Sequence, residues 1–288
     1  MKLIVILAAF ALERYFNVGA KLARFAWFER YVALLRQWCK AQAAWSGPAG
    51  IALVVAPLAI IVGLIYWLVG DGAYGLVGLV ISLVILIYCI GPQDWYQRAE
   101  HYLKAVSTEG EETVTVEQAV TDLMADETVE SEIPPLRQAT KSLFIQSLRN
   151  LFGVLIWFVI LGPIGAVIYR TSLLWQQLTA KTDSEYATYA ECALTWIQIL
   201  DWLPVRVVTL AYCLAGNFGA SFAFWIKHVA QGWSKNFEIL TESGLIALGV
   251  HEAQPTIDEN RDAIGLTHRA LIIVMVLIAI FTIGMWID

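Results

Sequence analysis

Three short clusters of ionisable residues interrupt stretches of sequence that are otherwise apolar. They are Leu12-Glu13-Arg14, Tyr169-Arg170, and the segment from Asp201 to Arg206, which reads DWLPVR. A charge surrounded by apolar residues is costly unless it is paired, solvated or used for function. Each cluster is therefore a candidate binding site. The structural alternative is a set of interfacial side chains that reach back to water.

The segment from Asp201 to Arg206 has the most specific chemistry. Pro204 lacks a backbone N–H, so we expect the helix to break there and expose unsatisfied backbone groups. At such a break Arg206 could hold a carboxylate or phosphate with two parallel hydrogen bonds, and Asp201 could bind an amine or orient the arginine. The pattern predicts a site for a small anionic or zwitterionic ligand that includes Trp202. The alternative is an Asp201–Arg206 pair that only satisfies the break.

A second interruption is expected at Gly162-Pro163, one to two helical turns before Tyr169 and Arg170. Paired interrupted helices are typical of membrane proteins that bind a substrate near the middle of the bilayer. The candidate ligand-binding residues are therefore Glu13, Arg14, Tyr169, Arg170, Asp201, Trp202, Pro204 and Arg206. The histidines lack helical metal spacing, and no HExxH, Walker A or GxSxG motif occurs, so the sequence assigns no metal site or catalytic residue and leaves any cofactor unknown.

The composition indicates which elements must carry these clusters. The chain of 288 residues is 58% apolar and 15% charged, against about 45–50% and about 25% in soluble domains. Uncharged runs of this length predict an all-α, polytopic membrane protein, with the lipid bilayer as its first partner. The four expected spans are 49–69, 75–91, 151–169 and 270–287. Segment 207–226 is either a fifth span or a packed helix.

We expect the chain to form a single membrane domain, 1–288, and the charges predict its orientation. Seven Lys and Arg residues precede the first span and none lies in the turn at 70–75, so we expect the N-terminus in the cytoplasm. Region 93–150 should then be an acidic cytoplasmic loop region, whereas the sidedness of the helical region 170–269 stays open. The net charge of −6 and the absence of a basic cluster exclude a nucleic-acid partner.

Three segments of the chain resemble the AmpE family of bacterial inner-membrane proteins. They are Leu12–Gly19 (LERYFNVG), Gly162–Arg170 (GPIGAVIYR) and Leu200–Val207 (LDWLPVRV), and the resemblance extends along nearly the whole chain. It implies a multi-pass signalling modulator of β-lactamase induction, and hence of antibiotic resistance, in the inner membrane of a Gram-negative bacterium. It also implies a link to cell-wall recycling. A cytoplasmic amidase that processes muropeptides, or another membrane protein, is the implied partner.

The chain is also distantly similar to the CobD/CbiB family of cobalamin-pathway membrane enzymes, which join an aminopropanol moiety to a corrinoid carboxylate. The shared elements correspond to Gly162–Arg170 and Pro204–Arg206. Those enzymes carry an acidic run before the third span, whereas residues 140–153 read TKSLFIQSLRNLFG and contain no carboxylate. Activation of a carboxylate with nucleotide and metal requires such acids, so the sequence favours a protein without this enzymatic activity.

Two functional hypotheses follow from these residues and resemblances. The leading one is a regulatory membrane sensor of β-lactamase induction and muropeptide recycling that binds a small ligand or a partner at the interrupted helices. The alternative is a membrane enzyme or transporter for an amine or carboxylate substrate, related to cobalamin-pathway amide synthesis.

Overall fold

The described part of the chain is helical, as the composition predicts. A computed structural model describes residues 2–16, 25–39, 45, 47–69, 76–90, 135–181, 186–249 and 257–287, and no strand occurs among them. The helices are α1 (Lys2–Phe16), α3 (Ala26–Trp38), α5 (Pro48–Val69), α6 (Leu76–Ile90), α9 (Pro135–Ser147), the π-helical turn η2 (Leu148–Phe152), α10 (Gly153–Leu161), α11 (Pro163–Ala180), η3 (Ala187–Tyr189), α12 (Ala190–Ala215), α13 (Phe218–His228), η4 (Trp233–Lys235), α14 (Asn236–Leu248) and α15 (Ile257–Ile287).

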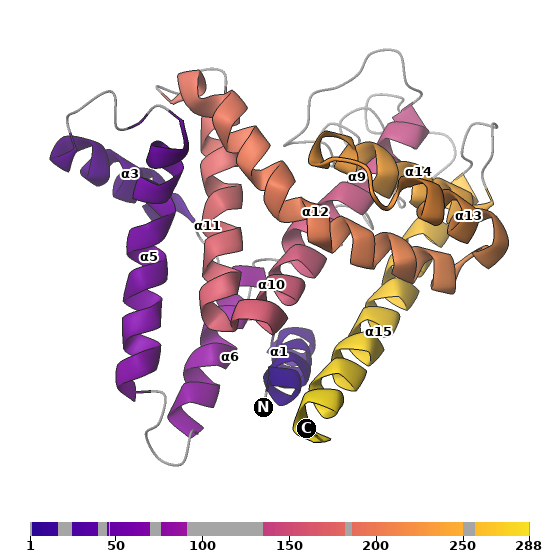
Figure 1. The fold of residues 1–288 in the computed structure, drawn as a ribbon, viewed down its shortest axis with the longest axis horizontal. Coiled ribbons are helices and arrows are strands. Elements are labelled where there is room, and N and C mark those ends of the chain that lie inside the picture. The colour runs from indigo at the N-terminus through magenta and orange to yellow at the C-terminus, as the bar shows by residue number, and fades with distance from the viewer. Residues whose placement is uncertain are drawn as a thin grey trace. The chain divides into compact units, whose positions relative to one another are not determined.

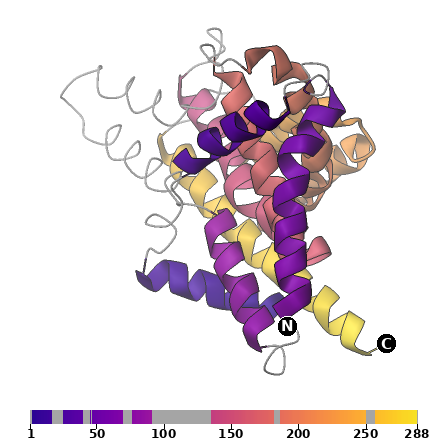
Figure 2. The same ribbon diagram turned by 90° about the vertical axis from the view of Figure 1, so that its left-hand side faces the viewer.

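Two compact units form from interleaved parts of the chain. The first comprises Met1–Pro92 and Gly153–Leu200, and the second comprises Gln93–Phe152 and Asp201–Asp288. In the first unit α11 packs against α5, α6 and α10, and α1 packs against α6 (Figures 1 and 2). In the second unit α9 packs against α14 and α15, and α13 packs against α14.

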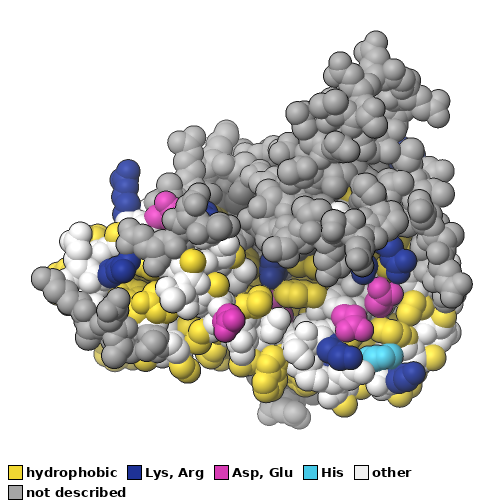
Figure 3. Space-filling model, turned by 90° about the horizontal axis from the view of Figure 1, so that it is seen from above, with side chains coloured by type: hydrophobic (Ala, Val, Ile, Leu, Met, Phe, Trp, Pro, Cys, Tyr) yellow, Lys and Arg dark blue, Asp and Glu magenta, His cyan; other side chains and the backbone are white. Residues whose placement is uncertain are grey.

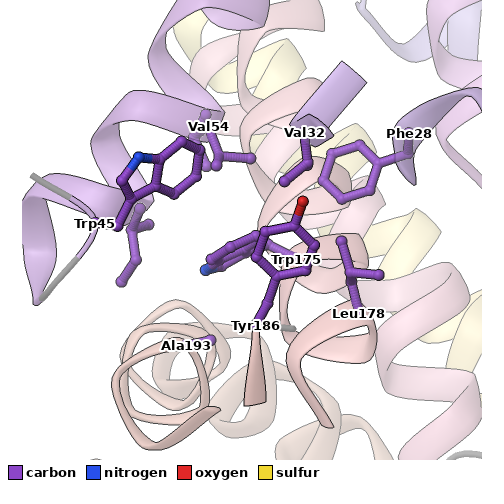
Figure 4. Close-up of a cluster of buried hydrophobic side chains, with 10 residues drawn as sticks. Phe28, Val32, Trp45, Val54, Trp175, Leu178, Tyr186 and Ala193 are labelled. Carbon is purple, nitrogen blue, oxygen red and sulfur yellow. The ribbon is translucent and has the colours of Figure 1, made fainter. Parts of the chain in front are cut away.

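The core of the first unit is aromatic. Trp175 of α11 is almost fully buried, and it packs against Trp45 and Tyr186 with ring centroids 6.3 and 5.6 Å apart. Phe28 and Val32 bring α3 onto this cluster (Figure 4). Large aromatic side chains of this kind supply most of the buried area and hold α3, α5 and α11 together.

Four helices among the described residues are long and apolar enough to cross a membrane. Their candidate spans are Pro48–Leu68, Arg137–Leu161, Ala187–Ala215 and Arg261–Ile280, which confirms the expected class of helical membrane protein. The expected span 75–91 is an apolar helix, α6, but its 15 residues cover only about 22 Å of the roughly 30 Å hydrocarbon core. Figure 3 shows one face, where exposed hydrophobic side chains lie beside scattered charged ones.

The expected span 151–169 is interrupted at Gly162-Pro163, as the sequence predicts, but the chain reverses there and the residues after it belong to a separate helix. Gly162 has a positive φ of 70°, and Pro163 then starts α11 as its first residue, so α10 and α11 form a helical hairpin. Gly165 permits the close approach, since a Cβ there would overlap the carbonyl oxygen of Trp157. The candidate span instead extends back to Arg137, and polar side chains of this stretch, such as Thr140 and Ser142, are buried.

The fifth candidate span, 207–226, is wrong as one continuous helix. α12 ends at Ala215 and α13 begins at Phe218. Between them the Asn217 amide donates to the carbonyl of Ala247, 2.9 Å away, and a Cβ on Gly216 would overlap that same carbonyl oxygen. Close packing of this turn on the end of α14 therefore overrides the apolar run. Three candidate spans overlap the expected spans 49–69, 151–169 and 270–287, whereas the fourth, Ala187–Ala215, takes the place of the expected span 75–91.

The expected break at Pro204 is absent, since α12 continues from Ala190 to Ala215 with this proline inside it. Proline cannot donate to the carbonyl four residues earlier, which is that of Leu200. The indole Nε1 of Trp157 donates to this carbonyl instead, at 3.1 Å. Neighbouring helices commonly satisfy backbone groups freed by a proline in this way, which allows the helix to continue.

Candidate functional site

The second unit buries an arginine that donates to three residues of the connection between α13 and α14. Arg206 lies in α12 and is only 6% exposed. Its Nε donates to the carbonyl of Val229 at 3.1 Å, its Nη2 to the carbonyl of Gln231 at 2.6 Å, and its Nη1 to the side-chain oxygen of Asn236. All three nitrogens of the guanidinium therefore hold the connection between α13 and α14.

Trp202 supports the arginine from one helical turn earlier in α12. The guanidinium carbon of Arg206 lies 5.0 Å from the centroid of the Trp202 ring, in a cation–π arrangement. The Trp202 Nε1 also donates to the carbonyl of Gln231, at 3.1 Å, so this carbonyl accepts from both side chains. We call Trp202, Arg206, Gln231 and Asn236 the Arg206 cluster.

The Arg206 cluster places a cation at the C-terminal end of α13. Val229 is the residue that caps this end, and the carbonyl groups there carry the negative end of the helix dipole. A guanidinium is suited to this position because it presents several donors in one plane and keeps its charge when buried. The structure brings Arg206 and Trp202 together on an unbroken helix, and their predicted role in binding a ligand stays a prediction.

Asp201 and Pro204, the other predicted residues of this segment, are also buried. Asp201 is 0% exposed on α12, and the expected pairing of Asp201 with Arg206 stays a prediction. Among the residues that the structure describes, no group of three or more His, Cys, Asp or Glu side chains could hold a metal ion.

Tyr169 and Arg170 lie on α11 in the first unit. Tyr169 is fully buried, and its ring covers Gly153 so closely that a Cβ there would overlap it. Arg170 is 7% exposed, and its guanidinium carbon lies 4.4 Å from the centroid of the Phe25 ring. It also lines a cavity of about 250 Å³ between α3, α5, α6 and α11.

The remaining predictions for the site are not resolved by the described residues. Glu13 and Arg14 belong to α1, but the positions of their side chains lie outside the described part of the structure, as does the acidic stretch from 109 to 132. The predicted clusters on α11 and α12 fall in different compact units. That they form one common site therefore stays a prediction.

Three polar residues of the second unit were missed by the sequence analysis. Gln231 and Asn236 complete the Arg206 cluster, and nothing in the local sequence marks them. Arg149 is 7% exposed in the π-helical turn η2, with its guanidinium carbon 4.8 Å from the centroid of the Phe237 ring. The sequence signal that could have identified Arg149 is its position directly before the uncharged run 150–169. The structural signal is the π-helical turn, because such turns are frequent at functional sites.

Comparison with known proteins shows the family to which the chain belongs. The family described as "Regulatory signalling modulator protein AmpE" matches residues 1–286. The chain belongs to the AmpE family. Within this AmpE-family chain, Gly162–Arg170 forms the hairpin turn and the start of α11, and Leu200–Val207 forms the middle of α12 around Pro204.

Curated relatives come from two groups of proteins. The AmpE-family chain is 22% identical over 209 residues to Protein AmpE of Shigella flexneri, covering 71% of this chain and 74% of the relative. It is 26% identical over 204 residues to the cobalamin biosynthesis protein CobD of Chromobacterium violaceum, covering 71% of this chain. A CobD of Stutzerimonas stutzeri is 26% identical over 114 residues, 40% of this chain.

The coverage of the CobD relatives is incomplete. The match spans 63% of the length of the Chromobacterium violaceum protein and 38% of that of the Stutzerimonas stutzeri protein. No solved structure matches the chain. The chain is therefore similar to part of the length of these CobD proteins.

Proposed function

We propose that this AmpE-family chain is a regulatory protein of the bacterial inner membrane that modulates β-lactamase induction in connection with muropeptide recycling. The family match over residues 1–286 and the similarity to Protein AmpE of Shigella flexneri support this proposal. In it the N-terminus is cytoplasmic, and the signal comes from a small anionic or zwitterionic ligand, or from a partner such as a cytoplasmic amidase or another membrane protein.

The observation that carries the proposal is the Arg206 cluster. A regulatory protein needs an element that can adopt two arrangements. Here one buried guanidinium holds the connection between α13 and α14 to α12. Two of its three acceptors are neutral backbone carbonyls, whereas a carboxylate or phosphate makes a stronger, charge-assisted pair with arginine. An anionic ligand that takes the place of those carbonyls would release the connection and change the surface of α13 and α14.

The test is an induction assay in a strain that has an inducible β-lactamase and lacks its own AmpE. We expect the wild-type chain to restore the normal ratio of induced to basal β-lactamase activity. Arg206→Lys keeps the charge but loses the planar set of donors, so it should fail to restore this ratio. Lys227→Gln is the matched control, because Lys227 is an exposed cation in the last turn of α13. Equal ratios for the wild type and Arg206→Lys, with both proteins in the membrane, would contradict the role of the cluster.

A second candidate function is amide formation in cobalamin biosynthesis, as an enzyme or a related transporter. The similarity to two CobD proteins favours it. It is tested by expressing the chain in a CobD-deficient strain that requires cobalamin for growth. Growth without added cobalamin would support an enzyme. No growth, together with restored β-lactamase induction, would support the regulatory function.

A further inference from the structure

One side of α13 is apolar and exposed. Phe218 at the start of this helix is 50% exposed, and Ile226 near its end is 57% exposed. Phe222 lies midway between them, so the three side chains follow one another at intervals of four residues on the same side of the helix. The Phe218 and Phe222 rings stack, with centroids 5.0 Å apart. We call Phe218, Phe222 and Ile226 the α13 strip.

The opposite side of α13 is fixed to the second unit. Ser221 is 0% exposed, and the helix packs against α14. The Trp225 indole Nε1 donates to the backbone carbonyl of Arg206 in α12, at 3.2 Å. These contacts determine which side of α13 turns outward. The exposure of the α13 strip is therefore a property of the folded unit.

The length of α13 and its place in the chain restrict where it can lie in a membrane. The candidate span Ala187–Ala215 ends three residues before α13 begins. A helix of 11 residues is about 16 Å long, which is roughly half of the 30 Å hydrocarbon core. α13 therefore starts where a span ends, at the level of the bilayer surface, and is too short to cross the bilayer again.

The surroundings of the α13 strip suit this level of the bilayer. Leu214, in the last turn of α12, is 50% exposed, so the apolar surface of α12 continues onto α13. Trp233 follows α13 in η4 and is 49% exposed. No Asp or Glu occurs in α13. Exposed tryptophan and a short helix with one apolar side are typical of segments that lie in the membrane interface.

We propose that α13 is an in-plane membrane helix that binds the surface of the phospholipid bilayer. It lies parallel to this surface, with the α13 strip at the boundary between headgroups and acyl chains. This role accounts for the apolar run 207–226 without a fifth span. It does not rest on the proposed regulatory function, because the position of α13 is measured in vesicles without any other ligand.

The test is the depth of spin labels on the full chain in vesicles of phosphatidylethanolamine and phosphatidylglycerol. The variants Phe218→Cys, Phe222→Cys and Ile226→Cys each receive one nitroxide, in a chain whose four native cysteines are replaced by alanine. Collisions with oxygen and with a water-soluble nickel chelate give the depth by electron paramagnetic resonance. Glu238→Cys is the control, because Glu238 is an exposed carboxylate in the first turn of α14 and its label should lie in water.

We expect the three labels of the α13 strip to lie at similar depths, about 5–10 Å below the headgroup surface. In a helix that crosses the bilayer, the labels at 218 and 226 would differ in depth by about 12 Å, since each residue adds 1.5 Å. That difference would overturn the proposal. Labels as accessible to nickel as the one at Glu238 would also overturn it, because the strip would then be free for water or a protein partner.

A pair of neighbouring substitutions tests whether the strip holds the helix in the interface. Ile226→Asp places a charge in the strip, so it should move the label at 218 towards water. Lys227→Gln, at the next residue, is the matched control and should leave that label at its depth. An unchanged depth in Ile226→Asp would overturn the proposal.

A second measurement keeps the native cysteines, in case their replacement unfolds the protein. Benzoylphenylalanine replaces Phe218 in the full chain, which is then illuminated in the same vesicles. We expect a lipid adduct on the protein by mass spectrometry, and benzoylphenylalanine at Glu238 should give none. Equal amounts of adduct at the two positions, or no adduct at Phe218, would overturn the proposal.

Discussion

Removal of the Trp157 indole tests how α12 continues through Pro204. Trp157→Phe keeps an aromatic ring but removes the Nε1–H that donates to the Leu200 carbonyl. Because Pro204 cannot supply a donor, that carbonyl is left without its indole partner in the variant. In a Pro204→Ala background the new backbone N–H at position 204 can donate to it. The effect of Trp157→Phe should therefore depend on residue 204.

The size of this dependence follows from one neutral hydrogen bond of 3.1 Å. Such a bond contributes about 0.5–1.5 kcal/mol net, and an unsatisfied buried carbonyl costs about 1–3 kcal/mol. We expect Trp157→Phe to lower the free energy of unfolding by about 2 kcal/mol in the wild-type background. In the Pro204→Ala background only the loss of ring packing remains. The coupling energy of the double-mutant cycle should then be about 1–2 kcal/mol.

The assay is unfolding in mixed detergent and SDS, followed by circular dichroism for the four chains of the cycle. Trp196→Phe is a matched control on the same helix, because its indole donates to the Ser172 hydroxyl at 2.9 Å and not to a backbone carbonyl of α12. Its effect should add to that of Pro204→Ala. If Trp157→Phe and Pro204→Ala are additive within about 0.5 kcal/mol, the indole does not compensate for the proline and the reasoning is refuted.

Two further predictions concern the first unit. Gly165→Ala should lower the free energy of unfolding by about 1–3 kcal/mol, measured in the same SDS assay, because its Cβ would overlap the Trp157 carbonyl. Gly63→Ala is its control, with its nearest neighbour a flexible Ile164 methyl at 3.4 Å, and an equal loss in both would contradict the close approach. Tyr31→Phe should cost about 1 kcal/mol near neutral pH, since the Tyr31 hydroxyl donates to the Val54 carbonyl at 3.0 Å. Burial raises the pKa of Tyr31 above its ordinary value of 10.0, so its contribution is complete below pH 10 and is lost as the pH rises through the higher pKa of the folded state. The difference in stability between wild type and Tyr31→Phe should shrink above about pH 10, and a constant difference would show that the hydroxyl is not buried.

The sequence by itself determined the class of the protein and much of its chemistry. Long uncharged runs require lipid or a helical interior, whatever their neighbours, so the membrane helices α5 and α15 could be predicted. Ionised residues within apolar sequence are costly wherever the chain places them. That cost is why Arg170 and Arg206 could be selected, and both are buried.

Only the tertiary structure decided where helices stop and which partners the buried charges have. Pro163 and Pro204 look alike locally, yet the first begins a new helix after Gly162 and the second lies inside α12. At Pro163 the preceding Gly162 has a positive φ and α10 has already ended. At Pro204 the indole of Trp157, 43 residues from Leu200 in sequence, donates to the carbonyl that the proline leaves free. Likewise Asn236 becomes a partner of Arg206 from 30 residues away. Local sequence specifies a backbone defect, but the groups that satisfy it come from distant segments, and only folding brings them together.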